Sequence, residues 1–133
     1  MRHLELFAGI GGFRRAMDLL TQDHIMDFHC IGYSEIDAKA VKTYCANYHP
    51  EVDGELAMGD IVEFTSNKNN MDNLPQFDLV TGGFPCQTFS MMGKQAGFNE
   101  DRGQMFFHII DILAVKMPRY VLLENVKNLK SHD

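Results

Sequence analysis

Short apolar runs alternate along this chain with segments whose apolar residues recur at helical spacing, and this alternation strongly constrains the fold. It is typical of βαβ units, in which a helix crosses between two parallel strands. Parallel sheets are covered by helices on both faces. We therefore predict an α/β fold, a Rossmann-like, doubly wound and mainly parallel sheet. The predicted strands are His3–Ala8, Phe28–Glu35, Leu56–Met58, Phe77–Gly82 and Tyr120–Glu124.

Three helices are predicted between these strands. The first covers Phe13–Leu20. The second begins after Asp37, its N-cap, and stops at Pro50. The third covers Gln104–Lys116. The polar stretch Ser66–Asn73 is predicted to be a loop. The residues predicted to face inward are Phe13, Ala16, Leu19 and Leu20 in the first helix, Val41, Tyr44, Cys45 and Tyr48 in the second, and Phe106, Ile109, Ile110 and Leu113 in the third.

Length and composition exclude several classes of protein. The 133 residues suit one domain, 1–133, and no apolar run is long enough for a membrane span. Cysteines number three, Cys30, Cys45 and Cys86, and lack a CxxC pair, which disfavours a disulfide scaffold or a cysteine metal site and favours the reducing cytoplasm. The net charge of −6 is unusual for a chain that binds nucleic acid by itself.

Glycines and acidic residues mark the ends of the first three predicted strands. The turn Phe7-Ala8-Gly9-Ile10-Gly11-Gly12 allows a ligand to approach the backbone, but it matches neither the dinucleotide fingerprint nor a phosphate-binding loop. Glu35 ends the second strand, where a carboxylate can accept hydrogen bonds from ribose hydroxyls. Asp60 follows the third strand, where it could accept a proton from an adenine amino group while Ile61 packs on the ring. Ordinary turn residues would explain each feature singly, but together they predict an adenosine pocket.

Two further residues predict the chemistry. Cys86 lies in a glycine-rich loop after the fourth strand, where a thiolate could act as a nucleophile. Glu124 closes the fifth strand, and a carboxylate there is costly to bury unless something uses it. If the two strands are neighbours, both side chains open into one cleft near the adenosine pocket. Conjugate addition to C6 of a pyrimidine would need this set of groups.

At these residues the chain resembles the DNA (cytosine-5) methyltransferase family. The segments that carry the resemblance follow one another in the family's order, and they are LELFAGIGGF, SEID, GDI, GGFPCQTFSMMGKQAGFNEDRG and PRYVLLENVKN. Together they span nearly the whole chain, and the PCQ and ENV motifs are the most specific of them. The resemblance implies the S-adenosylmethionine-dependent methyltransferase fold, methylation of C5 of cytosine in DNA, and a bacterial or phage-encoded enzyme of the restriction–modification type.

The resemblance also implies a cofactor, S-adenosyl-L-methionine, and roles for particular residues. Cys86 would add to C6 of a flipped-out cytosine, and Glu124 would hydrogen-bond the base. The segment Phe89–Arg102 is predicted to be a mobile lid. The implied cofactor-binding residues are Phe7, Gly9, Gly11, Glu35, Ile36, Asp60, Ile61, Pro85 and Met105, and the implied DNA-contacting residues are Gln87, Ser90, Lys94 and Arg102. Ile36 departs from the aromatic residue that commonly stacks on adenine in this family.

The family pattern continues beyond the motifs found here. An arginine-containing motif, a target-recognition domain and a C-terminal helix do not occur within the 133 residues. The resemblance therefore implies the amino-terminal catalytic half of such an enzyme, either a fragment or one chain of a split enzyme that needs a second polypeptide. In the family's sheet order, Tyr120–Leu123 would then be left as an apolar edge strand. Two alternatives remain open: a non-catalytic module that binds cofactor or partner, and a cytosine-5 methyltransferase that acts on RNA.

Overall fold

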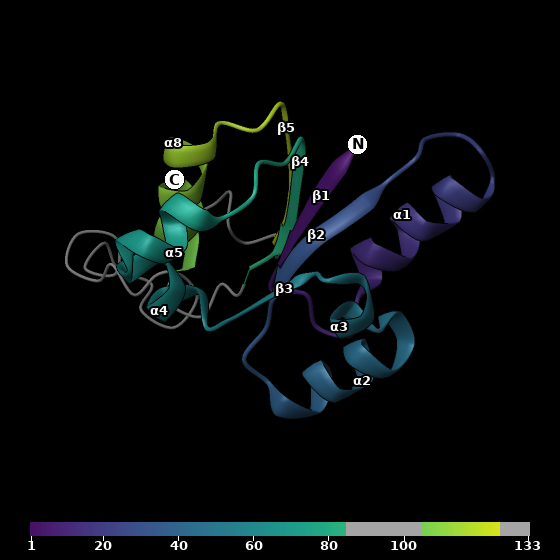
Figure 1. Ribbon diagram of the computed structural model, residues 1–133, viewed down its shortest axis with the longest axis horizontal. Helices are drawn as coiled ribbons and strands as arrows, with labels where there is room; N and C mark the ends of the chain where they lie inside the picture. Colours follow the sequence, from purple (N-terminus) through teal and green to yellow (C-terminus); the bar gives the residue numbers. More distant parts are fainter. Residues whose placement is uncertain (85–104, 126–133) are drawn as a thin grey trace.

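The computed structural model of the protein describes residues 1–84 and 105–125. Its strands form one parallel sheet in the order β3-β2-β1-β4-β5 (Figure 1). The strands are β1 (Arg2–Leu6), β2 (His29–Ser34), β3 (Leu56–Gly59), β4 (Leu79–Gly83) and β5 (Tyr120–Glu124), and the helices are α1 (Gly12–Gln22), α2 (Ala38–Tyr48), α3 (Pro50–Asp53), α4 (Ile61–Ser66), α5 (Lys68–Asn73) and α8 (Met105–Lys116). The predicted α/β fold with a mainly parallel sheet is confirmed.

The strand order reverses between β1 and β4. From β1 the chain moves outward to β2 and β3, and it then returns to β4 on the other side of β1. Right-handed crossovers place the helices of the two halves on opposite faces. Figure 1 shows α1 and α2 on one face of the sheet and α4, α5 and α8 on the other. The reversal creates the switch point at which ligands bind in doubly wound sheets, beyond the carboxyl ends of the strands.

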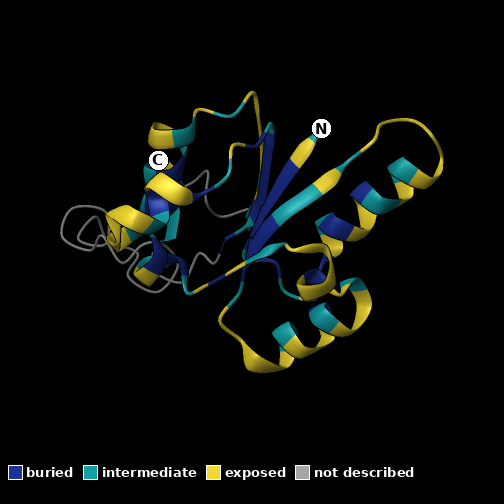
Figure 2. Ribbon diagram, in the orientation of Figure 1, coloured by how far each residue is buried: buried dark blue, intermediate teal, exposed yellow. Residues whose placement is uncertain are grey.

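The two faces of the sheet are packed differently. On the face covered by α4, α5 and α8, Leu4 and Leu6 of β1 and Val80 of β4 join Ile109 and Ile112 of α8 in one apolar core. Figure 2 shows that the buried residues lie mainly along the strands and on the inner sides of these helices. The opposite face holds a buried polar cluster instead.

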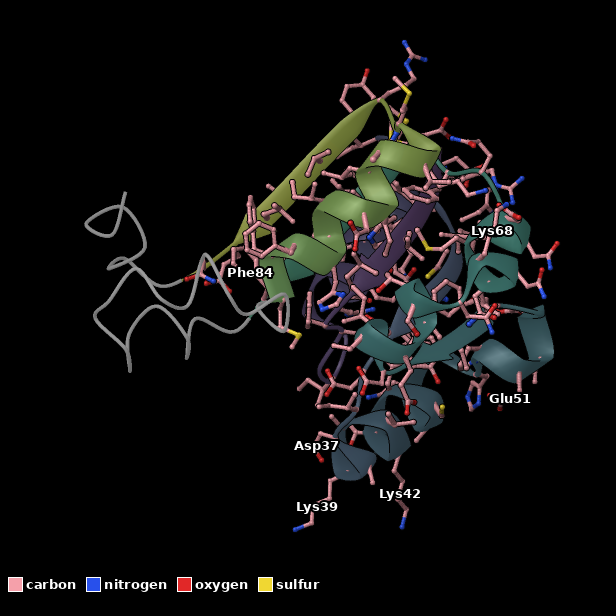
Figure 3. The ribbon with its side chains drawn as sticks, turned by 90° about the vertical axis from the view of Figure 1, so that its left-hand side faces the viewer. Asp37, Lys39, Lys42, Glu51, Lys68 and Phe84 are labelled. Atoms are coloured by element: carbon pink, nitrogen blue, oxygen red, sulfur yellow. The ribbon has the colours of Figure 1, made fainter. Side chains whose placement is uncertain are left out.

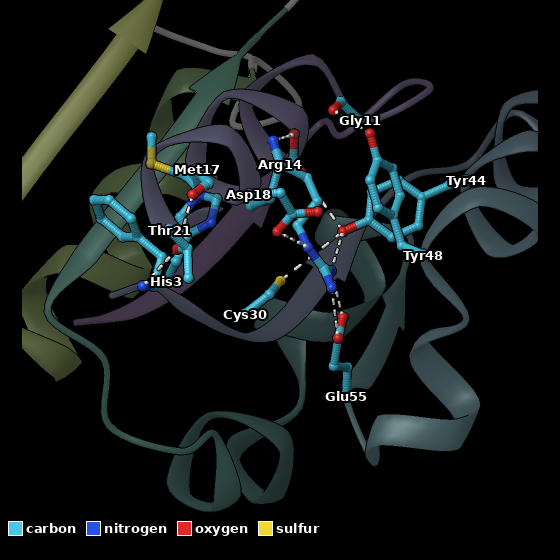
Figure 4. Close-up of polar contacts among 12 residues, drawn as sticks. His3, Gly11, Arg14, Met17, Asp18, Thr21, Cys30, Tyr44, Tyr48 and Glu55 are labelled. Atoms are coloured by element: carbon cyan, nitrogen blue, oxygen red, sulfur yellow. Dashed lines mark hydrogen bonds and ion pairs between the residues drawn. The ribbon is translucent and has the colours of Figure 1, made fainter. Parts of the chain in front are cut away.

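That polar cluster is centred on Arg14 of α1 (Figure 4). Its guanidinium donates to both carboxylate oxygens of Glu55, at 2.7 and 2.9 Å, and to the hydroxyl of Tyr44 at 3.3 Å. Glu5 of β1 accepts from the backbone N–H of Arg14 and from the Tyr44 hydroxyl, both at 3.2 Å. The side chains of Arg14 and Glu55 are only 10% and 4% exposed. This ion pair therefore ties α1 to the segment that enters β3.

The predicted helix faces are partly wrong for this reason. In α1 the buried residues are Arg14 and Met17, whereas Leu19 of the predicted apolar face is 42% exposed. The polar cluster draws Arg14 inward, so α1 is turned away from the face that its apolar spacing indicates. In α8, Ile109 is buried as predicted, but Ile110 is 40% exposed and Ile112 is buried in its place.

Element boundaries also differ from the predictions. The stretch Ser66–Asn73, predicted to be a loop, holds the end of α4 and all of α5. The Asn67 side chain accepts from the N–H groups of Asn69 and Asn70 and so caps α5, and Met71 buries the helix against the core. Asp37 caps α2 as predicted, and α2 ends before Pro50, which begins the short helix α3.

β5 is an edge strand among the described residues, as expected from the sequence. It pairs with β4 on one side, from Leu79↔Tyr120 to Gly83↔Glu124. Along β5, Tyr120, Val121 and Leu122 are 49%, 46% and 48% exposed. The strand thus leaves apolar surface and unpaired backbone groups along its outer side.

In the described part of the chain, no helix has the length and apolar character needed to cross a membrane.

The pKa values of two buried side chains on β1, Glu5 and His3, are shifted in opposite directions. Burial raises the pKa of Glu5 to about 7, and burial with the nearby Arg14 charge lowers the pKa of His3 to about 4. The folded chain retains a proton on Glu5 that the unfolded chain loses, so this contribution to stability is complete below pH 4.5 and is lost as the pH rises through 7. The His3 contribution is complete above pH 6.5 and is lost as the pH falls through 4.

We predict that Glu5→Gln removes the pH-dependent contribution of Glu5 to stability and leaves that of His3. Between pH 4.5 and 6.5, the free energy of unfolding of the variant should rise relative to wild type by about 2 kcal/mol, because the slope approaches about 1.4 kcal/mol per pH unit only between the two pKa values. Urea unfolding of both proteins at several pH values measures this difference. Glu51→Gln, the same change at an exposed site on α3, is the control and should stay parallel to wild type. A Glu5→Gln difference that is constant over this range would contradict the titration of Glu5.

Candidate cofactor and active site

One cavity lies at the switch point, where the carboxyl ends of the strands meet. It has a volume of about 410 Å³, which falls within the range of small-molecule sites. Its lining combines apolar side chains, two carboxylates and two glycines, which come from the carboxyl ends of the strands, the residues that follow them, and the starts of α4 and α8. The lining residues are Phe7, Ser34, Glu35, Ile36, Gly59, Asp60, Ile61, Val62, Gly83 and Met105.

Glu35 stands at the end of β2 and accepts hydrogen bonds from three backbone N–H groups. Its Oε1 accepts from Gly9 at 2.8 Å, and its Oε2 accepts from Ile36 at 3.1 Å and Asp37 at 2.9 Å. These bonds fix the carboxylate at the wall of the cavity. The side chain of Ile36, 74% exposed, offers an apolar surface beside it.

Asp60 is held by the helix that follows it. It is the N-cap of α4, and its Oδ1 accepts from the N–H of Val62 at 2.8 Å. A carboxylate has about four acceptor positions, so capping leaves capacity for a ligand. Ile61 beside it is buried, at 3% exposure, and anchors this wall of the cavity in the apolar core.

The ends of β4 and β5 meet at the other side of the cavity. Gly83 lines the cavity, and a Cβ atom at this position would lie 2.9 Å from Oε1 of Glu124, so the Glu124 carboxylate lies over Gly83. The Asn125 side chain donates to the carbonyl oxygen of Phe84 at 2.6 Å and joins the two strand exits. Phe84, labelled in Figure 3, is buried. Its ring lies 5.8 Å from that of Phe106 at the start of α8.

The structure brings together most of the described cofactor residues predicted from sequence. Six of them line the cavity: Phe7, Glu35, Ile36, Asp60, Ile61 and Met105. Gly9 is not in the lining but is bonded to Glu35, and Gly11 lines a separate hollow with Arg15 and Tyr48. The predictions for Pro85, Cys86, Gln87, Ser90, Lys94 and Arg102, and for the Phe89–Arg102 lid, lie outside the described residues.

Sequence reasoning missed four lining residues: Ser34, Gly59, Val62 and Gly83. Each is next to, or two residues from, a predicted site residue or lies in a glycine-rich stretch. Ser34 had the clearest signal, because a serine that ends a strand can bond a neighbouring turn, and its hydroxyl accepts from the N–H of Phe7 at 3.0 Å. Within residues 1–84 and 105–125, no cluster of three or more His, Cys, Asp or Glu side chains could hold a metal ion.

Comparison with known proteins places this geometry in a family. The family described as C-5 cytosine-specific DNA methylase matches residues 1–133. The type II methyltransferase M.HpaII of Haemophilus parainfluenzae is 44% identical over 130 residues, which are 98% of this chain and 32% of that protein. The orphan methyltransferase M.Rho11sI of Bacillus phage rho11s is 42% identical over 133 residues, which are 100% of this chain and 24% of that protein.

A solved structure agrees in fold. A mutant of DNMT2 from Spodoptera frugiperda superposes with a TM-score of 0.63 and 26% identity, over 98% of this chain and 37% of that chain. The chain thus spans about a quarter to a third of the length of these two curated relatives. Both the sequence match over all 133 residues and the shared fold lead to one conclusion. This chain belongs to the C-5 cytosine-specific DNA methylase family.

Proposed function

We propose that the chain is the amino-terminal catalytic half of a DNA (cytosine-5) methyltransferase and transfers a methyl group to C5 of cytosine. One observation carries the proposal: a single cavity extends from the carboxylates of Glu35 and Asp60 to Gly83, over which Glu124 lies. A nucleoside-sized site and the carboxylate proposed to bind the target base therefore lie at the same end of the sheet, on either side of Gly83. The names of the relatives, type II and orphan methyltransferases, support the same activity.

The residues of the cavity fit S-adenosyl-L-methionine, which supplies an electrophilic methyl group when it is bound. Glu35 would accept a hydrogen bond from the ribose, and Asp60 would accept one from the adenine amino group. Ile36 and Ile61 would pack against the ring, and Phe7 and Met105 would close the cavity from either side. Apolar walls with a few placed acceptors suit a ligand with a planar base and a polar sugar.

The chemistry proposed for this chain rests on Cys86 and Glu124. Cys86 follows Gly83 by three residues in the sequence and is the proposed nucleophile. The thiolate would form a C–S bond to C6 of a cytosine flipped out of the duplex, which raises the electron density at C5. Glu124 would hydrogen-bond N3 and the exocyclic amine of the base. After methylation, a water molecule takes the C5 proton, the electron pair of that C–H bond re-forms the C5–C6 double bond, and the C–S bond breaks to release the Cys86 thiolate.

Duplex DNA and a second polypeptide are the proposed partners. Gln87, Ser90, Lys94 and Arg102 are proposed to contact DNA. The apolar edge strand β5, about half exposed along Tyr120–Leu122, is proposed to pair with a strand that the second polypeptide supplies. The net charge of −6 favours this division of roles, because phosphate binding needs basic residues that this chain has in short supply.

Asp60→Asn tests the cofactor site. Asparagine still caps a helix, so the fold should persist, but the loss of the carboxylate should weaken binding of S-adenosylhomocysteine about tenfold, or ~1.4 kcal/mol. Isothermal titration calorimetry measures the affinity. The matched control is Asp37→Asn, because Asp37 caps α2 in the same way, is exposed (Figure 3) and lies outside the cavity lining. Equal affinities of wild type and both variants would argue against Asp60 as an adenine acceptor.

Cys86→Ala and Cys86→Ser test the nucleophile. Methyl transfer by the complemented enzyme should fall at least 100-fold, about 3 kcal/mol, because the covalent step is lost. A duplex that contains 5-fluorocytosine should be trapped covalently by wild type and not by either variant. Retention of a tenth of the wild-type turnover by Cys86→Ala would disprove the assignment. Failure of the complemented wild type to form the trapped complex would favour a non-catalytic module.

The need for a second polypeptide is tested by complementation. Tritiated methyl transfer to duplex DNA should be low for the 133-residue chain and should rise at least tenfold when a C-terminal half from a relative is added. Leu122→Lys on β5 should reduce that gain about tenfold, because it places a charge on the docking edge. Val52→Lys on α3, where the side chain is 77% exposed, is the control. Full activity of the chain by itself would overturn the proposal.

A further inference from the structure

The turn that follows β1 is attached to the end of β2 by three consecutive backbone N–H groups. Phe7 donates to the Ser34 hydroxyl at 3.0 Å, and Ala8 donates to the Ser34 carbonyl at 2.8 Å. Gly9 then donates to Oε1 of Glu35 at 2.8 Å. The regular pairing of β1 with β2 ends at Glu5↔Tyr33, so these bonds extend the attachment beyond the sheet.

The backbone of this turn needs such support. Phe7 has a φ of 53°, in the left-handed region that side chains other than glycine rarely adopt, and Gly9 follows with a φ of 59°. A non-glycine residue in this region is strained and persists only where its surroundings determine its conformation. Phe7 also lines the cavity. The bond that the Phe7 N–H donates to Ser34 therefore holds a strained residue at the wall of the proposed cofactor site, and the bonds that Ala8 and Gly9 donate to Ser34 and Glu35 hold the rest of its turn.

Most of the hydrogen-bonding capacity of Glu35 is used within the protein. A carboxylate has about four acceptor positions. Three are occupied by the N–H groups of Gly9, Ile36 and Asp37. About one position is then left for a ligand such as a ribose hydroxyl.

We propose that Glu35 is a positioning residue that braces the Phe7–Gly9 turn and so shapes the cofactor cavity before the cofactor binds. The proposal deepens the proposed function and rests on it for the identity of the ligand. Oε2 of Glu35 accepts hydrogen bonds within the turn that follows β2, and Oε1 accepts one from the turn that follows β1. The side chain therefore links these two turns at the carboxyl ends of the strands. Ribose recognition alone would not require the bond to Gly9.

Two variants distinguish the bond from Glu35 to Gly9 from the bonds that Glu35 makes within its own turn. Glu35→Gln replaces one acceptor oxygen by an NH₂ group, which faces N–H donors and cannot accept from them. In Glu35→Asp the shorter carboxylate can still accept from the N–H of Asp37, two residues on, as aspartate does in turns. It loses the reach to Gly9. Glu51→Gln on α3 is the exposed control.

The first measurement is amide hydrogen exchange of the free 133-residue chain by NMR. With Glu35→Asp, the Gly9 amide should exchange at least tenfold faster than in wild type, while the Asp37 amide stays within threefold of its wild-type rate. With Glu35→Gln, one oxygen remains as an acceptor, so the Gly9 or the Asp37 amide, whichever faces the NH₂ group, should exchange faster. Unchanged exchange of Gly9 in Glu35→Asp would overturn the brace, whether or not Glu35→Gln folds.

The second measurement is the affinity of each protein for S-adenosylhomocysteine and for its 2′,3′-dideoxy analogue. The analogue has no ribose hydroxyl for Glu35 to accept from, so a ribose-recognition role leaves its affinity unchanged. The brace predicts that Glu35→Asp weakens the analogue at least threefold. Equal affinity of wild type and Glu35→Asp for the analogue would overturn the proposal. If wild type binds neither compound, the proposed cofactor is wrong, and the Gly9 exchange still decides whether Glu35 braces the turn.

Discussion

The buried ion pair between Arg14 and Glu55 is the interaction on which one face of the sheet depends. Burying two charges is costly, and the cost is offset only when the geometry is good and the remaining donors are satisfied. Here the guanidinium bonds both carboxylate oxygens and also reaches Tyr44, while the Arg14 N–H bonds Glu5. The pair therefore fixes α1, α2 and the entry to β3 relative to β1.

The opposite face depends on apolar packing of Leu4, Leu6 and Val80 against α8. The strands between these two faces pair in parallel, so the carboxyl ends of all of them lie at one edge of the sheet. At that edge, Glu35 and Asp60 directly follow β2 and β3, and Glu124 is the last residue of β5. The cavity is thus a consequence of topology, and the polar bonds of the turns refine its shape.

The sequence predicted the strands well because apolar runs between turn residues are a local signal. Tyr120–Glu124 was placed correctly at both ends, and Asp37 was recognised as a helix cap. The inward face of α1 was not predicted, because Arg14 is buried by partners 30 and 41 residues away, Tyr44 and Glu55. Likewise, α5 was missed because its helical spacing is short and its support comes from Met71 in the core.

The sequence by itself determined the fold class, the family motifs and most of the cavity lining, because these depend on residue types in a fixed order. The tertiary structure decided which of those residues share a cavity and which only support it. Gly9 is the clearest case: its position in a motif marks it as a site residue, but its N–H is bonded to Glu35 and it does not line the cavity. Hydrogen bonds between two separate turns depend on where the chain brings them together, and no local pattern of residues records that distance.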